Sequence, residues 1–445
     1  MDFEERLAGF SSSRYQQLRP SQAQVLKGYV RHIDVKDVAI ELPTGFGKTL
    51  VALLIADLAL EQGRTVAYLT GTNQLADQVL LQARDLPGLE AVKFSSKNYP
   101  PAALANYHDA QAVGVMNYWT YFNSSPKVEP ADLVIFDDAH LAEQPLAGLF
   151  AIRIDSWRQR EFYQRLCDLV LAHTDLYPSI ELMRDGVAGP TVPPELLTFP
   201  HWAAIVDQTA DILTENLPSD DARFVWPTVR PHLHACGVLI GPAAIEIRPY
   251  HPPTQTLLGY RQANQRLYLS ATLGTMDDLQ RRLGIAPVVN VLDQPIAEEG
   301  VGHRLLLLAP GDGAATLDRA MQLALDQARH AGRTTWLCSS HPEADHLETF
   351  LSARNLSTYR LRGGGDDSAL DRWIASADGH LVTAGRYDGL DFAGDLCRLV
   401  ILPSLPAAST EFERFVMALP RRRNLHASPR RTARHPSPRP RQSRG

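Results

Sequence analysis

The sequence predicts an α/β fold with two doubly wound parallel-sheet units, the first of which is interrupted by a mainly helical insertion. Short apolar strands alternate with helical patterns between residues 37 and 140, and this alternation resumes between residues 265 and 404. Strands that alternate with helices form parallel sheets whose two faces are covered by those helices. Residues 141–260 replace the alternation with amphipathic helical segments separated by prolines, which is typical of an inserted domain.

The first unit begins with an apolar strand at 37–42 and a helix at 49–63, where Gly63 is a stop signal. Its other expected elements are strands at 65–70, 91–95, 112–117, 132–138 and 265–272, and a helix at 72–86. The elements expected in the second unit are strands at 304–310, 334–340, 357–363, 380–385 and 397–404, and helices at 315–332, 342–355 and 410–419.

These elements also predict the domain boundaries. We assign residues 1–140 and 261–300 to the first α/β unit, residues 141–260 to the insertion, and residues 301–419 to the second unit. Residues 420–445 are rich in Arg, Pro, Ser and His and contain almost nothing apolar. Such a segment cannot bury enough surface to fold, so we expect it to be disordered.

The composition is that of an ordinary globular protein of 445 residues, with 44% hydrophobic and 21% charged side chains. No apolar run is long enough to span a bilayer, and the N-terminus is acidic and polar rather than a signal peptide. We therefore expect a cytoplasmic protein without a membrane partner. The four cysteines have no C-x-x-C spacing, which argues against a disulfide framework and against a zinc or iron–sulfur site.

The charge is distributed unevenly along the chain. The net charge is −6, yet residues 420–445 contain nine arginines and no acidic residue. The first 419 residues therefore hold 35 basic and 50 acidic side chains, a net charge of −15. A nucleic-acid-binding surface in this part of the chain has to gather its positive charge locally.

The stretch ELPTGFGKTL (41–50) matches the phosphate-binding pattern G-x-x-x-x-G-K-[ST] except at its first glycine. Gly45 and Gly47 let successive backbone N–H groups point inward. Lys48 can then reach the β/γ-phosphates of a nucleotide, and the Thr49 hydroxyl can ligate Mg²⁺. The loop also leads into a helix N-terminus, which binds anions through its backbone dipoles. The alternative interpretation is a glycine turn that happens to contain a lysine.

The apolar strand in LVIFDDAH (133–140) runs into two carboxylates. In P-loop NTPases a carboxylate at this strand end holds Mg²⁺ opposite the P-loop hydroxyl, and that role falls to Asp137. Asp138 can polarise the attacking water. Two acids at a strand end are also compatible with a solvated turn, but a P-loop upstream on a neighbouring strand favours the nucleotide site. The two motifs support each other, and Leu42 in place of the first glycine is then a tolerated variation.

Three stretches occur in the order of motifs I, II and III of superfamily 2 helicases and resemble them: PTGFGKT (43–49), DDAH (137–140) and SAT (270–272). Four more stretches are similar to the adenine-reading segment and to motifs Ia, Ib and V: LRPSQAQVL (18–26), YLTGTNQLADQV (68–79), GVMNYWTYF (114–122) and TAGRYDGLDFAGD (383–395). The resemblance covers residues from about 15 to about 419. It implies two RecA-like domains and hydrolysis of ATP with Mg²⁺.

The resemblance also implies residue roles. ATP would contact Gln22, Thr44, Gly45, Phe46, Gly47, Lys48, Thr49, Gly389 and Asp391. Mg²⁺ would be held by Thr49 and Asp137. The catalytic set would be Lys48, Asp137, Asp138, His140, Ser270 and Thr272, with His140 linking the nucleotide site to motif III. Thr72, Asn73 and Asn117 would contact the nucleic-acid backbone. Of the four aromatic residues at 118, 119, 121 and 122, we expect at most one to stack on a base and the others to pack in the core.

The long insertion and the wording GRYDGLDF resemble the DinG/XPD-like branch, in which the insertion forms an arch over DNA. The chain departs from that branch because it has no cysteine between Lys48 and Asp137, where the iron–sulfur members have four. It also has Asp138 where the family has glutamate. No Q-x-x-G-R-x-x-R pattern, the family's motif VI, follows Asp391. We interpret residues 420–445 as a reading-frame change or truncation, with a functional basic tail as the alternative, and expect slow ATP turnover.

The sequence thus predicts an ATP-dependent helicase or translocase that moves on single-stranded nucleic acid, with DNA as the expected substrate and RNA as the other candidate. The competing class is a nucleotide-dependent nucleic-acid-binding or regulatory protein without productive unwinding. A small-molecule kinase with a P-loop explains neither the SAT motif nor the second α/β unit. The sequence identifies no protein partner.

Overall fold

The structure is a computed structural model that describes the chain except for residues 1, 13, 96, 124, 190, 216, 218–221, 295, 297–304, 306–316, 330, 363–367, 385–391, 393, 405–409 and 427–445. Contacts divide the chain into two compact units. One unit contains Met1–Ile152, Arg223–Pro231 and Arg248–Ala407, and the other contains Arg153–Ala222, His232–Ile247 and Ala408–Gly445.

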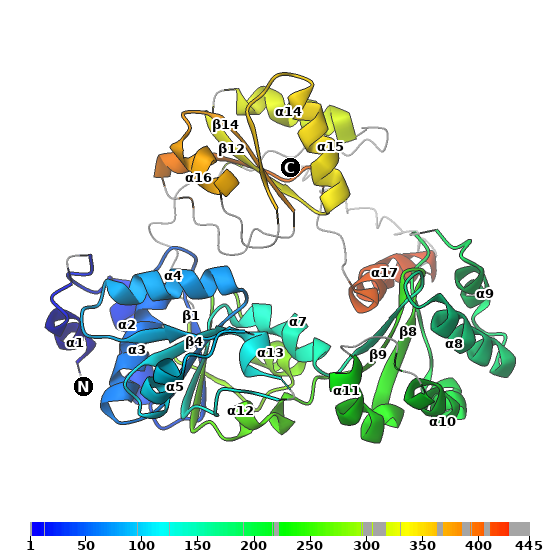
Figure 1. The fold of residues 1–445 in the computed structure, drawn as a ribbon, viewed down its shortest axis with the longest axis horizontal. Coiled ribbons are helices and arrows are strands. Elements are labelled where there is room, and N and C mark those ends of the chain that lie inside the picture. The colour runs from blue at the N-terminus through cyan, green and yellow to red at the C-terminus, as the bar shows by residue number, and fades with distance from the viewer. Residues whose placement is uncertain are drawn as a thin grey trace, which may run out of the picture. The chain divides into compact units, whose positions relative to one another are not determined.

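A seven-stranded parallel sheet forms the core of the first α/β unit, in the order β11-β1-β10-β5-β2-β4-β3. Figure 1 labels β1 and β4 of this sheet. Its strands are β1 (Asp37–Glu41), β2 (Val66–Thr70), β3 (Ala91–Lys93), β4 (Val113–Asn117), β5 (Leu133–Phe136), β10 (Gln265–Ser270) and β11 (Val289–Asn290). Its helices are α1 (Phe3–Gly9), α2 (Pro20–Arg31), α3 (Lys48–Glu61), α4 (Asn73–Arg84), α5 (Pro101–His108), α6 (Tyr118–Tyr121), α7 (Glu143–Gly148), α12 (Leu258–Arg261) and α13 (Met276–Leu283).

Both faces of this sheet are buried under helices. Val38 and Ile40 belong to one apolar cluster and Ala39 to another, because successive side chains of a strand point to opposite faces. Burial on both faces explains why the strands read as continuous apolar runs rather than as alternating patterns.

The strand order corrects one expectation from the sequence. We expected the P-loop strand and the strand before the two carboxylates to be neighbours, but β10 lies between β1 and β5 and pairs with both. The strand that precedes the SAT motif is therefore central. Since parallel strands end at the same edge of a sheet, the P-loop, the acidic pair and the SAT motif meet at the carboxyl edge, where α/β sheets bind their ligands.

The second α/β unit has a four-stranded parallel sheet in the order β13-β14-β12-β15. Its elements are β12 (Arg333–Cys338), β13 (Thr358–Leu361), β14 (Gly379–Ala384), β15 (Leu399–Ile401), α14 (Leu317–Ala328), α15 (His341–Ser352) and α16 (Ser368–Ala375). Apart from Leu305, the strand expected at 304–310 lies outside the described residues.

The insertion contains a sheet that the sequence interpretation missed. The two helical segments expected at 161–174 and 201–217 are present as α8 (Arg160–His173) and α10 (Phe199–Glu215), and the structure adds α9 (Pro178–Asp185) and α11 (Ala222–Val229). The sheet has the order β6-β9-β8-β7, from β6 (Ile152–Asp155), β7 (Glu195–Leu196), β8 (Cys236–Ile240) and β9 (Ala244–Pro249). All five residues of β8 are buried, so it shows no period-two pattern to separate it from a buried helix.

The last helix of the described residues, α17 (Glu411–His426), packs against β8 and groups with the insertion, as Figure 1 shows. We had assigned residues up to 419 to the second α/β unit and had expected disorder from residue 420. The helix instead continues through residue 426. The three arginines that follow Pro420 have a high helix propensity, whereas Pro420 itself disfavours a helix interior. Residues 427–445 lie outside the described residues.

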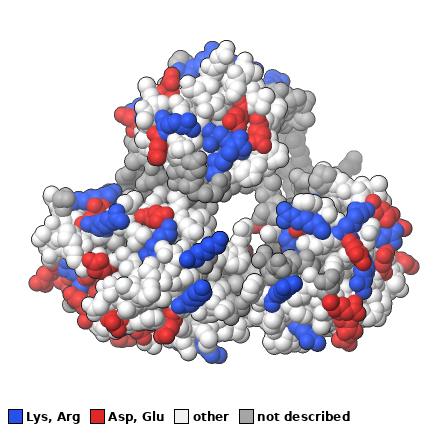
Figure 2. Space-filling view, viewed as in Figure 1, with Lys and Arg blue, Asp and Glu red and all other residues white. Residues whose placement is uncertain are grey.

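Figure 2 shows how charge is distributed on one face of the described chain. Lysine and arginine side chains are interspersed with aspartate and glutamate on each part that is visible, rather than gathered in one basic surface. Among the described residues, no helix combines the length and the apolar character needed to cross a membrane.

Candidate nucleotide site

The P-loop lies between the end of β1 and the start of α3. Leu42, which occupies the position of the first glycine, is fully buried, and its N–H donates to the Ser270 carbonyl at 3.0 Å. This position therefore belongs to the core and to the contact with β10, which explains why an apolar residue fits there.

The two remaining glycines have backbone conformations that suit a phosphate-binding loop. Gly45 has φ of 85° and Gly47 has φ of 80°, in the left-handed region that favours glycine. A Cβ at Gly45 would meet no atom within 4 Å, so the space beside the loop is open. Gly47 is the N-cap of α3 and supplies no capping side chain, so that end of the helix is suited to an anion.

Gln22 and Arg19 hold the P-loop from α2. Gln22 is 3% exposed, and its Nε2 donates to the carbonyls of Phe46 (3.0 Å) and Gly47 (3.5 Å). Its Oε1 accepts from the Arg19 backbone N–H at 2.9 Å, and the Arg19 guanidinium donates to the Gly45 carbonyl at 2.7 Å. The structure therefore gives Gln22 a contact with the loop backbone, whereas its expected contact with adenine remains a prediction. The sequence interpretation gave Arg19 no role.

Asp137 is buried at the end of β5 and is fixed by three neighbours. Its Oδ2 accepts from the Tyr68 phenol at 3.0 Å, and its Oδ1 accepts from the Asp138 backbone N–H at 3.0 Å. The Tyr118 phenol donates to the Asp137 carbonyl at 2.7 Å. Burial, and then the neighbouring Asp138 charge, raise the pKa of Asp137 to about 6.

Tyr68 connects the P-loop to the acidic pair. Besides donating to Asp137, its phenol lies close enough to the Thr49 side chain for the two to interact. One buried hydroxyl thus lies beside both residues that were predicted to hold Mg²⁺. Neither Tyr68 nor Tyr118 was predicted from the sequence, because a tyrosine in a buried strand or beside it resembles any other core residue.

Asp138 faces the P-loop lysine. Its backbone has φ of 46°, an uncommon conformation for a residue other than glycine. The Nζ of Lys48 lies 3.1 Å from Asp138 Oδ1, and both side chains are partly exposed. The P-loop cation and the second carboxylate therefore meet on the accessible side of the site.

His140 is hydrogen-bonded to the SAT motif. Its Nδ1 lies 2.9 Å from Ser270 Oγ, which also accepts from the Thr272 backbone N–H at 3.2 Å. This pair connects the turn after β5 with the end of β10.

Thr72, Asn73 and Asn117 come together at the carboxyl ends of β2 and β4. Asn117 Nδ2 donates to Asn73 Oδ1 at 2.8 Å. Thr72 Oγ1 caps α4 by accepting from Leu75 N–H, and Asn117 Oδ1 caps α6 by accepting from Thr120 N–H. These side chains therefore have local structural roles besides the nucleic-acid contact predicted for them.

Of the four aromatic residues that follow β4, three are core residues: Tyr118, Tyr121 and Phe122 are each at most 3% exposed. Trp119 is 48% exposed and is the member of the group that is available for stacking. Two predicted ATP contacts, Gly389 and Asp391, lie outside the described residues.

The described residues fit MgATP. The open space beside Gly45 suits phosphates, Lys48 supplies a cation, and the start of α3 supplies backbone N–H groups. Thr49 and Asp137 supply the oxygen ligands that Mg²⁺ prefers.

Comparisons with known proteins identify one matching family and several similar structures. Residues 15–171 match the family described as Type III restriction enzyme, res subunit (ResIII). A comparison with curated protein sequences finds no match. Among solved structures, the chain resembles "XPD_Helicase" with a TM-score of 0.52 and 13% identity, over 91% of this chain and 88% of that chain. It resembles "Structure of S. tokodaii Xpd4" with a TM-score of 0.53 and 13% identity, over 90% and 88%.

At this level of identity the structural likeness concerns the fold. It confirms the expected α/β class, and together with the ResIII match it confirms the expected resemblance to helicases of XPD-like layout.

Proposed function

We propose that this chain is an ATP-dependent translocase or helicase acting on single-stranded nucleic acid. Its match to the ResIII family at residues 15–171 and its likeness in fold to the XPD structures support this proposal. Single-stranded DNA is the substrate that we favour, and MgATP is the cofactor.

One observation supports this proposal most directly. Lys48 of the P-loop lies 3.1 Å from Asp138, and the next carboxylate, Asp137, is held in the core by Tyr68. Lys48 follows β1 and the two carboxylates follow β5, and β10 separates these two strands, so their meeting depends on the fold rather than on sequence proximity. A cation and two carboxylates at the end of a parallel sheet are the groups that phosphoryl transfer requires.

The residues act mainly by positioning and by charge. Mg²⁺, when bound, neutralises charge on the phosphates. Lys48 would turn from Asp138 towards the phosphates and stabilise their negative charge. The carboxylate of Asp138, once released, would accept a hydrogen bond from the attacking water and orient it. A movement of His140 would shift Ser270 at the end of β10, because the two side chains are hydrogen-bonded.

The nucleic-acid contact is proposed at the carboxyl ends of β2 and β4. The amides of Asn73 and Asn117 and the hydroxyl of Thr72 are of the kind that contact phosphate oxygens. Trp119 is exposed beside them on α6 and offers a ring on which a base can stack.

The test is ATP hydrolysis by the purified chain with and without single-stranded DNA or RNA, in the parent and in Lys48→Ala. We expect slow hydrolysis that nucleic acid stimulates and that Lys48→Ala removes, because Lys48 is the cation beside the acidic pair. Lys127→Ala is the matched control, since Lys127 is exposed and its ammonium lies over the Tyr99 ring.

Unchanged hydrolysis in Lys48→Ala would exclude this site as the source of the activity. ATP binding without nucleic-acid-stimulated turnover would instead favour a nucleotide-dependent binding or regulatory protein. A strand-displacement assay with 5′- and 3′-tailed DNA and RNA duplexes then distinguishes a helicase from a translocase.

A further inference from the structure

The first turn of α17 is bound by the insertion. The N–H groups of Glu411 and Phe412 donate to the two carboxylate oxygens of Glu246 on β9, at 3.0 and 3.2 Å. The first N–H groups of a helix have no partner within the helix, and a carboxylate is the acceptor that best suits them. Glu246 is 5% exposed and is also bound by Arg153, whose NH1 donates to Oε1 at 2.9 Å.

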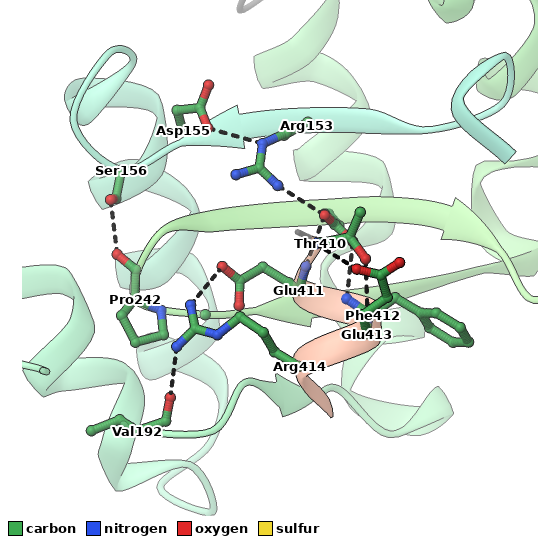
Figure 3. A network of polar contacts seen from close by, with 12 residues as sticks. Arg153, Asp155, Ser156, Val192, Pro242, Thr410, Glu411, Phe412, Glu413 and Arg414 are labelled. Atoms are coloured by element: carbon green, nitrogen blue, oxygen red, sulfur yellow. Dashed lines mark hydrogen bonds and ion pairs between the residues drawn. The ribbon is translucent and has the colours of Figure 1, made fainter. Parts of the chain in front are cut away.

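The helix also caps itself, as Figure 3 shows. Thr410 Oγ1 accepts from the Glu413 N–H at 3.1 Å, and Glu413 Oε2 accepts from the Thr410 N–H at 3.2 Å, which is a capping box. The N–H groups of residues 411, 412 and 413 therefore all have partners. Glu246, about 165 positions earlier in the chain, supplies two of these three acceptors.

Side chains of α17 fix the contact further. Glu411 is 1% exposed, and a Cβ at Gly241 would lie 1.9 Å from its Oε2, so the turn after β8 is filled by this carboxylate. Arg414 NH1 donates to Glu411 Oε1 at 3.2 Å, and NH2 donates to the Val192 carbonyl at 3.3 Å (Figure 3). The contact thus combines a capped helix end with a close fit at a glycine.

The order of the elements along the chain relates this contact to the second α/β unit. The second α/β unit, from α14 to β15, follows the first sheet in sequence and precedes α17. Only the residues between Ile401 and Glu411 join β15 to α17, and an extended chain of that length spans about 35 Å. With α17 bound, the second unit is attached at both of its ends. With α17 released, it is attached only at its start.

We propose that the insertion surface around Glu246 and Gly241 is a binding site for the chain's own C-terminal helix, and that this contact is a tether that restricts the second α/β unit. The proposal does not depend on nucleotide or nucleic acid, so it can fail or succeed independently of the proposed function.

The first test measures whether Glu246 holds α17. Hydrogen exchange of the full chain is compared among the parent, Glu246→Ala and the control Glu181→Ala, which removes an exposed carboxylate of the insertion that pairs with Arg184. We expect amides in residues 411–419 and in β9 to exchange about tenfold faster in Glu246→Ala only, because two charge-assisted hydrogen bonds are lost. Exchange in β1 and α3 should not change. Equal protection of α17 in all three proteins would overturn the assignment.

The second test measures the tether. Dyes are attached at Asp175→Cys in the insertion and at Thr349→Cys on α15, with Cys397→Ser because the other three cysteines are buried. We expect the distribution of single-molecule energy-transfer efficiencies to be narrow in the parent and broad in Glu246→Ala.

A second variant separates loss of the tether from damage to the insertion. Twenty Gly/Ser residues placed between Ala407 and Ala408 should keep α17 protected from exchange and still broaden the distribution, because such a linker is flexible. Equal distributions in all proteins would overturn the tether. Energy transfer between separately labelled molecules after mixing would also overturn it, because α17 would then bind a second copy.

Discussion

The phenol of Tyr68 donates a 3.0 Å hydrogen bond to Asp137 Oδ2 and also contacts the side chain of Thr49. This hydroxyl lies beside both residues proposed to hold Mg²⁺, and it comes from β2, a strand that contains no recognised catalytic residue. Its hydrogen bond stabilises the ionised form of Asp137 and so lowers the pKa that burial raises.

We therefore predict that Tyr68→Phe weakens Mg²⁺-dependent nucleotide binding about fivefold, which corresponds to one hydrogen bond of about 1 kcal/mol. The measurement is a Mg²⁺ titration of fluorescent ATP binding at several pH values, with the midpoint of the pH profile moving upward in the variant. Tyr29→Phe is the control, because Tyr29 is also buried and donates one hydrogen bond, to Gln265. A shift of equal size in both variants would show that general loosening of the fold, rather than Tyr68, is responsible.

Asp137 should also link stability to pH. Its folded pKa of about 6 lies above the ordinary value of 3.8, so its contribution to stability is present at low pH and is lost as pH rises through about 6. We predict that Asp137→Asn, measured in EDTA, is more stable than the parent at pH 8 by about 1–3 kcal/mol. The advantage should disappear by about pH 4, because the parent carboxyl is then neutral. Thermal unfolding across this range checks the prediction, and a constant difference at every pH would contradict it.

Asp138 is predicted to act after nucleotide binding. Asp138→Asn keeps the shape of the side chain but removes the charge that faces Lys48 at 3.1 Å. We expect ATP binding within about twofold of the parent and loss of turnover by at least about 100-fold, the scale of general-base catalysis. Stopped-flow binding and steady-state hydrolysis separate the two effects. Turnover at the parental rate would assign the base to another residue.

Glu411 should make the contact of α17 sensitive to pH. Burial, opposed by Arg414 and reinforced by Glu246, raises the pKa of Glu411, and its Oε2 has no hydrogen-bond partner among the described residues. Because the folded pKa is raised, this carboxyl stabilises the bound helix most at low pH, and the contribution is lost as pH rises.

We predict that Glu411→Gln slows exchange of residues 411–419 by about threefold at pH 8 relative to the parent, with little difference at pH 4.5. Glu181 is an exposed carboxylate of the same unit, and in Glu181→Gln residues 411–419 should exchange at the parental rate at both pH values. Faster exchange in Glu411→Gln at pH 8 would mean that the ionised carboxylate, through Arg414, stabilises the contact.

The geometry of the candidate nucleotide site was predictable where short sequence motifs define it. Gly45, Gly47 and Lys48 follow a pattern that needs only backbone freedom and one cation, and His140 does meet Ser270. The position of β10 between β1 and β5 was not predicted, because strand order depends on contacts between distant segments. Tyr68 was missed for a similar reason, since its role depends on what its hydroxyl reaches.

The insertion and the C-terminal helix were predicted least well. In CGVLIGPAAIEIRP (236–249), two short apolar runs flank a Gly-Pro turn, which is a hairpin signal that helical neighbours obscured. The end of the second domain was misplaced because α17 begins with an ordinary capping box, and nothing near it in sequence indicates Glu246 as its partner.

The place of the insertion within the first sheet has one more consequence. β5 and β10 are adjacent and parallel, and the chain between them is residues 137–264. Two adjacent parallel strands always need a crossover connection, for which a dozen or more residues suffice. The whole insertion is therefore an enlarged crossover loop rather than an interruption of the sheet. A helix of ordinary length could take its place without altering the order of the strands that carry the P-loop, the acidic pair and the SAT motif.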